Sequence, residues 1–119
     1  MNHENIIKVF DLMEFKNFLL MPMEIGKFSL MQLIKQRFRN KKGFTEEEVA
    51  QIMKGVLEGL NHMHSTRKIL HRDLKPDNVL MISKTDFSKL KIIDFGMATE
   101  IDDIQDFVSC GTWTYQPPE

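Results

Sequence analysis

The sequence predicts a single domain of the α+β class. Two segments, starting near residues 30 and 46, carry apolar residues three and four positions apart behind a capping signal, which is typical of amphipathic helices. Short apolar runs bounded by polar residues lie before and after these helices and are typical of strands. With 119 residues, the chain can form one domain with a modest core but not two.

The composition is that of an ordinary globular protein. Hydrophobic residues make up 42% and charged residues 28%, and the formal net charge is -1. No apolar run approaches the roughly 20 residues of a membrane span, and the first residues lack the pattern of a secretion signal. Cys110 is the single cysteine, which excludes an internal disulfide. We therefore expect an intracellular, cytoplasmic protein with no nucleic-acid or membrane partner.

The first two strands are predicted at residues 6–10 and 18–23. Each run is short, apolar and bounded by polar residues. We expect them to form an antiparallel pair, joined near residues 13–16.

The first helix is predicted to follow Ser29. Ser29 and Gln32 have the spacing of a capping box, in which each side chain binds the other residue's backbone N–H. Apolar residues follow at helical spacing, and a basic stretch at residues 37–42 and then Gly43 end the helix. The apolar residues are Leu30, Leu33, Ile34 and Phe38.

The second helix has the strongest periodic signal and is predicted from Glu46 to near His64. Thr45 and Glu48 form a second capping box. Gly55 and Gly59 lie inside the helix, where glycine is unfavourable by roughly 1 kcal/mol, so we expect them to allow close packing with a neighbour. The apolar stripe consists of Val49, Ile52, Met53, Val56, Leu60 and Met63.

A hairpin is predicted after the helices. Its strands are the apolar runs at residues 79–82 and 90–93, and its turn is the polar segment 83–89.

Three motifs in order make the chain recognisable. Residues 71–78 read His-Arg-Asp-Leu-Lys-Pro-Asp-Asn, residues 94–96 read Asp-Phe-Gly, and residues 111–119 read Gly-Thr-Trp-Thr-Tyr-Gln-Pro-Pro-Glu. This set resembles the catalytic loop, the metal-binding motif and the activation segment of eukaryotic protein kinases. The resemblance implies a protein kinase-like fold and an ATP-dependent serine/threonine protein kinase.

The resemblance also implies the roles of the loop residues. Asp73 would orient the substrate hydroxyl and accept its proton, and Lys75 would contact the transferring phosphate. Asn78 and Asp94 offer the hard oxygen ligands that Mg²⁺ prefers. Lys75 is typical of serine/threonine kinases, so the expected partner is a protein substrate with a Ser or Thr acceptor.

The nucleotide base is expected near the strand at residues 18–23. In the family this strand leads to the hinge, so Met23 would guard the back of the adenine pocket. The backbone carbonyl of Glu24 and the amide of Gly26 would face the adenine edge, with Leu80 beneath the ring. Without the resemblance, the same residues would be read as a core strand and a turn.

Regulation is expected in the activation segment. Arg72 would bind a phosphate placed there, with Ser109 as the first candidate because the usual position holds Val108. Thr99 and Thr112 are weaker phosphorylation candidates, and Thr112 is better suited to positioning substrate. Alternatively, acidic residues would supply a permanent charge for Arg72: Glu100, Asp102, Asp103 and Asp106.

Other polar residues are expected to have structural roles. In the family, His71 and Phe95 pack in a hydrophobic column. A zinc site built from His62, His64 and His71 is disfavoured, because the spacing matches no known ligand pattern and no further cysteine helps.

The chain matches about half of the family's catalytic domain. Residues 1–28 would be a remnant of the small lobe and the hinge, and residues 29–119 the first half of the mainly helical large lobe. The family pattern places three strands and a helix before Met1 and further helices after Glu119. Within the sequence the glycines are not spaced to form a glycine-rich phosphate loop.

Two function hypotheses follow. Either the sequence belongs to an active serine/threonine kinase, or the chain is a non-catalytic fragment or interaction module without the glycine-rich loop and the nucleotide-binding lysine. We expect the 119 residues alone to be inactive and able to self-associate through exposed apolar surface. An in-frame glycine-rich strand pair and lysine upstream of Met1 would favour the first hypothesis.

Overall fold

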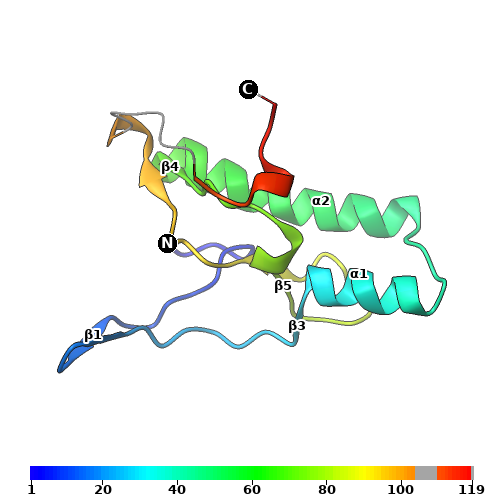
Figure 1. The fold of residues 1–119 in the computed structure, drawn as a ribbon, viewed down its shortest axis with the longest axis horizontal. Helices are drawn as coiled ribbons and strands as arrows, with labels where there is room; N and C mark the ends of the chain where they lie inside the picture. The colour runs from blue at the N-terminus through cyan, green and yellow to red at the C-terminus, as the bar shows by residue number, and fades with distance from the viewer. Residues whose placement is uncertain (104–109, 119) are drawn as a thin grey trace.

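A computed structural model describes residues 1–103 and 110–118 of the chain. It has the mixed α+β composition that the sequence predicted, with two main helices lying over short strands (Figure 1). The molecule measures 44 × 37 × 26 Å along its principal axes. Within the described residues, none of the helices has the length and apolar character needed to cross a membrane.

The first hairpin differs from the prediction. β1 (Met13–Phe15) pairs with β2 (Phe18–Leu20) in antiparallel register, so the segment expected to be the connection is itself a strand. The reason is that Lys16 has φ 55, which creates the turn two residues before β2. The predicted strand at residues 6–10 makes only isolated bridges, from Ile6 to Ile92 and from Val9 to Met23.

The second hairpin is confirmed. β5 (Val79–Met81) and β6 (Leu90–Ile92) pair in antiparallel register, with Val79 opposite Ile92. β3 (Phe28–Ser29) joins the other edge of β5 to complete a three-stranded sheet. A further pair, β4 (Ile69–Leu70) with β7 (Thr99–Glu100), was not predicted.

The first helix begins as predicted, and its capping box is confirmed. α1 (Leu30–Arg39) follows Ser29, whose side chain accepts from the Gln32 N–H while Gln32 accepts from the Ser29 N–H. Phe38 was expected on the apolar face but is 84% exposed. Arg37, and not Phe38, contacts the second helix, where it makes two 2.7 Å hydrogen bonds to Glu48.

The second helix also begins where predicted. α2 (Glu46–Asn61) is capped by Thr45 and continues as one π-helical segment (His62–Thr66), not as regular helix to His64. Its buried face contains Ile52, Gly55, Val56 and Gly59. Val49 and Met53, predicted in the stripe, are 46% and 47% exposed.

The glycines explain that difference. A Cβ at Gly59 would lie 2.8 Å from Ile92 Cδ1 and 3.1 Å from the backbone oxygen of Asn5, so only glycine allows α2 to approach β6 this closely. Close packing on the glycine face turns Val49 and Met53 away from the sheet, and the predicted packing role of the glycines is confirmed.

The core lies between α1, α2 and the three-stranded sheet. Seven buried side chains form its main cluster, and they come from the helices, the hairpin strands and the hairpin loop. They are Leu33, Ile52, Val56, Val79, Met81, Phe87 and Leu90. The catalytic-loop motif leads directly from β4 into β5, so its end is anchored in this core.

Candidate active site

His71 anchors the start of the loop. Its side chain is 3% exposed, and its Nε2 lies 2.9 Å from the carbonyl oxygen of Ile93. Its Nδ1 accepts from the Asp73 N–H, and its ring lies 5.4 Å from that of Phe95. These contacts connect the loop to the strand that leads to Asp94.

Asp73 is the centre of a hydrogen-bonded network. Its Oδ1 accepts from the hydroxyl of Thr112 at 2.7 Å, and its Oδ2 lies 2.9 Å from Lys75 Nζ. Lys75 also donates to the Thr112 hydroxyl at 2.6 Å. Asn78 Nδ2 donates to the Asp73 carbonyl oxygen and carboxylate at 3.0 and 3.2 Å. Four residues singled out from the sequence therefore meet at one carboxylate.

The network keeps Asp73 ionised. Hydrogen bonds from Lys75, and next from Thr112, lower the pKa of Asp73 to about 2. The same pairing with Asp73 raises the pKa of Lys75, to which the nearby charges of Asp77 and Asp94 also contribute. At neutral pH the site therefore presents a carboxylate and an ammonium group side by side.

Gly111 brings the segment that begins at Cys110 onto the loop of residues 71–78. It has φ 92, a conformation that side chains rarely adopt, and a Cβ there would overlap the backbone oxygen of Arg72. Because the backbones approach so closely, Thr112 reaches Asp73. Gln116 Nε2 then donates to the Cys110 carbonyl oxygen at 2.7 Å and closes this turn.

Asn78 and Asp94 lie at the same end of the second hairpin. Val79 faces Ile92 in the register, and the Ile93 N–H donates to the Asn78 carbonyl oxygen at 3.0 Å, so Asp94 is one residue beyond that pair. Asp94 is exposed, with Oδ1 accepting from the Gly96 N–H.

The two side chains suit a magnesium ion shared with phosphates. No hydrogen bond within the described residues uses Asn78 Oδ1 or Asp94 Oδ2, so both oxygens are available to a cation. In the described part of the chain, no group of three or more His, Cys, Asp or Glu residues is arranged to hold a metal ion. Mg²⁺ bound to nucleotide phosphates commonly uses only one or two protein carboxylates, so this donor set fits.

Two of the four predicted hinge residues, Gly26 and Leu80, meet at β5. The Lys27 N–H donates to the Met81 carbonyl oxygen, and Ser29 faces Leu80 in the register. A Cβ at Gly26 would overlap the Leu80 side chain, so these two predicted residues are in contact.

Met23 and Glu24 line a separate cavity of about 490 Å³, together with Phe10, Ile25, Ile82 and Lys91. Glu24 pairs with Lys91 at 2.8 Å, and this hydrogen bond lowers the pKa of Glu24. The four predicted hinge residues thus lie in two adjoining groups, not around one cavity.

Arg72 is exposed next to the network. Its φ is 62, and its Nε donates to the Met97 carbonyl oxygen at 2.7 Å, just after the Asp-Phe-Gly motif. Ser109, its predicted partner, lies outside the described residues, as do Val108 and Asp106.

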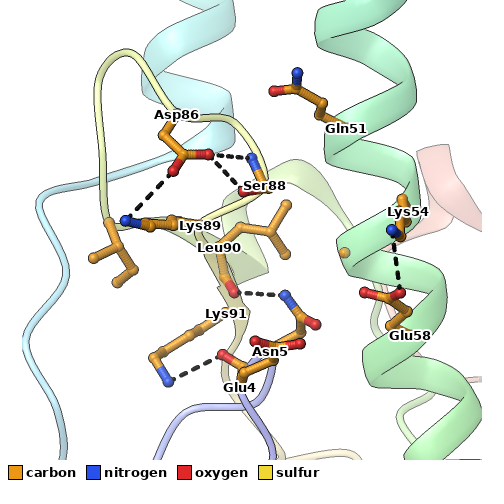
Figure 2. A pocket seen from close by; sticks show the side chains of 12 residues that line it. Glu4, Asn5, Gln51, Lys54, Glu58, Asp86, Ser88, Lys89, Leu90 and Lys91 are labelled. Carbon is orange, nitrogen blue, oxygen red and sulfur yellow. Dashed lines mark hydrogen bonds and ion pairs between the residues drawn. The ribbon is translucent and has the colours of Figure 1, made fainter.

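A larger cavity, of about 610 Å³, contains none of the predicted site residues. Figure 2 shows it between α2, the hairpin loop and the N-terminal turn. Many of its charged groups are already paired with one another, including Lys54 with Glu58 and Lys89 with Asp86. We therefore place the candidate site at Asp73 and not here.

The sequence missed three parts of the site. Gly111 belongs to a motif, but the motif does not show that the positive φ of this glycine determines where Thr112 lies. The ion pair between Glu24 and Lys91 joins residues 67 positions apart, so no local sequence pattern indicates it. The Met97 carbonyl, which binds Arg72, is a backbone group and invisible to residue patterns.

Comparisons with known proteins agree with the motifs. The family model described as protein kinase domain matches residues 1–119. The chain is 33% identical to calcium/calmodulin-dependent protein kinase type 1 of Caenorhabditis elegans over 119 residues, covering 100% of this chain and 33% of the relative. It is 35% identical to death-associated protein kinase 2 of Mus musculus over 120 residues, covering 98% and 31%.

Sperm motility kinase 3A of Mus musculus is 38% identical over 121 residues, covering 99% of this chain and 22% of the relative. The chain thus spans a third or less of the length of these relatives. The family match over the whole chain confirms the resemblance: the chain belongs to the protein kinase family, of the serine/threonine type.

Proposed function

We propose that the protein containing these residues transfers a phosphoryl group from Mg-ATP to a serine or threonine hydroxyl of a protein substrate. The observation that carries the proposal is the network at Asp73, where an ionised carboxylate, an ammonium group and a hydroxyl lie within 2.9 Å of one another. A positioned carboxylate and a cation are what phosphoryl transfer requires from the protein.

Each residue has a role in this proposal. Asp73 orients the acceptor hydroxyl and receives its proton, and Lys75 stabilises negative charge on the transferring group. Thr112 holds the activation segment against both residues, next to the place where a substrate chain would lie. Asn78 and Asp94 would hold Mg²⁺, which supplies charge neutralisation at the phosphates when bound.

The nucleotide base would lie where the two groups of hinge residues adjoin, Met23 with Glu24 and Gly26 with Leu80. Support for this comes from the contact of Gly26 with Leu80 and from the cavity beside Met23. In this proposal, residues 1–28 correspond to the end of the small lobe and the hinge, and residues 29–119 to the first half of the large lobe. An intracellular location is part of the same proposal.

The test compares two substitutions in the protein encoded by the longest reading frame that contains these residues. Asp73→Asn should lower phosphate transfer to a protein substrate by about 10² to 10⁴-fold, the usual contribution of a positioned base. Asp77→Asn is the control, because Asp77 is an exposed acid in the same loop. Equal activity of Asp73→Asn and Asp77→Asn would contradict the proposal.

A second pair tests the metal site. Asp94→Asn should raise the Mg²⁺ concentration needed for half-maximal activity, because it removes a ligand charge. Asp86→Asn, in the loop between β5 and β6, is the control and should not. A purely reduced rate, with unchanged Mg²⁺ and ATP dependence, would contradict the role of Asp94.

Regulation through Arg72 is part of the proposal. Arg72 donates from Nε to the Met97 carbonyl oxygen. Within the described residues its two terminal nitrogens make no hydrogen bond or ion pair, so both can bind an anion. Ser109→Ala should reduce activity and Ser109→Glu restore it if Ser109 carries the phosphate. Unchanged activity in both would favour a permanent acidic partner, and unchanged activity in Arg72→Ala would contradict either version.

The alternative is a non-catalytic interaction module. The observation favouring it is the exposed apolar surface of residues 9–25, which offers area for a protein partner. We expect the 119-residue chain alone to transfer no phosphate, because its glycines do not form a phosphate-binding loop. Measurable turnover by this chain would contradict that expectation.

A further inference from the structure

The turn between α1 and α2 carries an exposed basic surface, which we call the basic corner. Lys35, Phe38 and Arg39 lie at positions i, i+3 and i+4 of α1 and therefore share one side of the helix. Lys41 and Lys42 follow directly, and all five residues are exposed, Phe38 by 84%. None of these four cations belongs to an ion pair found within the described residues.

The corner keeps a net positive charge. The nearest acidic residues in sequence with no ion pair within the described residues are Glu46 and Glu47, at the start of α2, so four cations stand against two acids. Glu48, the third acid there, forms an ion pair with Arg37. A large exposed aromatic ring among exposed cations is suited to a partner that is acidic and also carries an apolar side chain.

A second surface of the same chain has that composition. Glu100, Ile101, Asp102 and Asp103, here called the acidic end, lie at the end of β7 and in the 3-10 turn after it. All four are exposed, and Ile101 is the apolar member. The exposed Lys68 lies beside them, so three acids stand next to this cation. Their backbone is held in place, because Glu100 pairs with Ile69 and the Ile101 N–H donates to the Lys68 carbonyl oxygen at 2.7 Å.

The two surfaces cannot meet within one molecule. Figure 1 shows the acidic end, in orange, at one end of the long axis and the turn between α1 and α2 at the other, with the full length of α2 between them. Contact between them requires two copies. The contact is also heterologous, because different surfaces of the two copies meet, so each copy keeps one surface free for the next.

We propose that the basic corner of one copy binds the acidic end of a second copy, with Phe38 of the first against Ile101 of the second. The contact is small and largely ionic, which places it among weak, transient interfaces. Its strength depends on screening, since the Debye length falls from about 10 Å at 0.1 M salt to about 3 Å at 1 M. Association through apolar surface would respond in the opposite way, because excluded salts strengthen it.

The experiment measures the mass of the 119-residue chain by sedimentation velocity over a range of concentrations. At 0.1 M salt the average mass should rise with concentration, and 1 M salt should weaken association by about tenfold or more. A corner variant, Lys35→Gln with Arg39→Gln, and an acidic-end variant, Asp102→Asn with Asp103→Asn, should each lose the association that 1 M salt weakens. The matched control is Lys54→Gln with Lys84→Gln, two exposed lysines elsewhere, which should associate like the original chain.

Mixing the two variants provides the decisive test. Together they retain one intact basic corner and one intact acidic end, so an equal mixture should form a species of two chains and nothing larger. Circular dichroism checks that each variant is folded, and Phe38→Ser, which leaves every charge in place, should weaken association on its own.

Several results would overturn the proposal. They are a single-chain mass up to about 1 mM at 0.1 M salt, association that the neutral variants leave unchanged, and a mixture that forms no two-chain species. Binding to vesicles of phosphatidylserine and phosphatidylcholine that depends on Lys35 and Arg39, with no self-association, would instead assign the corner to a lipid surface.

Discussion

The region around the catalytic loop and the arm formed by residues 8–25 differ sharply in how their side chains are used. In the first region, Met81 and Ile92 are fully buried, and Asp73 has several hydrogen-bond partners. In the arm, the apolar side chains face solvent. They are Val9, Phe10, Leu12, Met13, Phe15, Phe18, Leu19, Leu20, Met21, Met23 and Ile25.

The difference has a simple physical origin. The arm is mainly a two-stranded hairpin, which has no second layer among the described residues and is marginal in water by itself. The loop region has a helix on one side and a three-stranded sheet on the other. The geometry at Asp73 therefore depends on α1, which contacts residues 76–78, on the second hairpin and on the segment after Cys110, and not on the arm.

The largest expected effect is the difference in stability between two variants, each with one methionine replaced by alanine, one in each region. Met81→Ala should destabilise the protein by about 2–5 kcal/mol, because Met81 is 0% exposed and its loss leaves a cavity in the core. Met21→Ala should change stability by less than about 0.5 kcal/mol, because Met21 is 50% exposed. Urea unfolding followed by far-ultraviolet circular dichroism measures both, and similar midpoints for the two variants would contradict the comparison.

A smaller effect is expected where α2 contacts β6. Gly59→Val should cost about 1–3 kcal/mol, because the new side chain would push against Ile92 and the Asn5 backbone. Gly43→Val is the matched control, because no atom lies within 4 Å of a Cβ at Gly43. Equal unfolding midpoints would show that α2 does not need this close approach.

The stability of the packed region should also depend on pH. His62 stacks on His3, with ring centroids 4.8 Å apart, and its Nε2 is buried without a hydrogen-bond partner among the described residues. Burial, and then the charges of His3 and Arg67, lower the pKa of His62 below its usual value of 6.5. The unfolded chain therefore binds more protons, so stability is intact above about pH 6.5 and declines as the pH falls below it.

The measurement is the urea midpoint at about pH 8 and about pH 5, in the original chain and in His62→Phe. His62→Phe should reduce the loss of stability at low pH, whereas His64→Phe should not, because His64 is exposed. A loss of the same size in all three proteins would mean that other groups cause it.

The regions also differ in how well the sequence predicted them. Both helix starts were predicted because capping boxes are local, as in the pairs Ser29 with Gln32 and Thr45 with Glu48. The exposure of Val49 was not predictable, because apolar spacing alone does not show that glycines form the buried face.

The site was recognisable only through its motifs. Asp73 and Thr112 are 39 positions apart, and no periodic pattern relates them. Their contact depends on the positive φ of Gly111, which is a property of the folded backbone. Likewise, the strands β4 and β7 have two residues each and are too short for a sequence pattern to predict.

The smallest expected effect lies at the tip of the arm. Lys16 is the first residue of the two-residue turn between β1 and β2, and its φ of 55 is a conformation that glycine adopts without strain. Lys16→Gly should therefore stabilise the hairpin locally by about 1 kcal/mol. Hydrogen exchange at the β1 and β2 amides should slow by about fivefold, while the urea midpoint of the whole protein stays unchanged, because the arm packs against little else. Asn17→Gly is the matched control, since Asn17 is not among the residues with positive φ. If Lys16→Gly raised the global midpoint, the arm would be coupled to the core, and the two regions would form one cooperative unit.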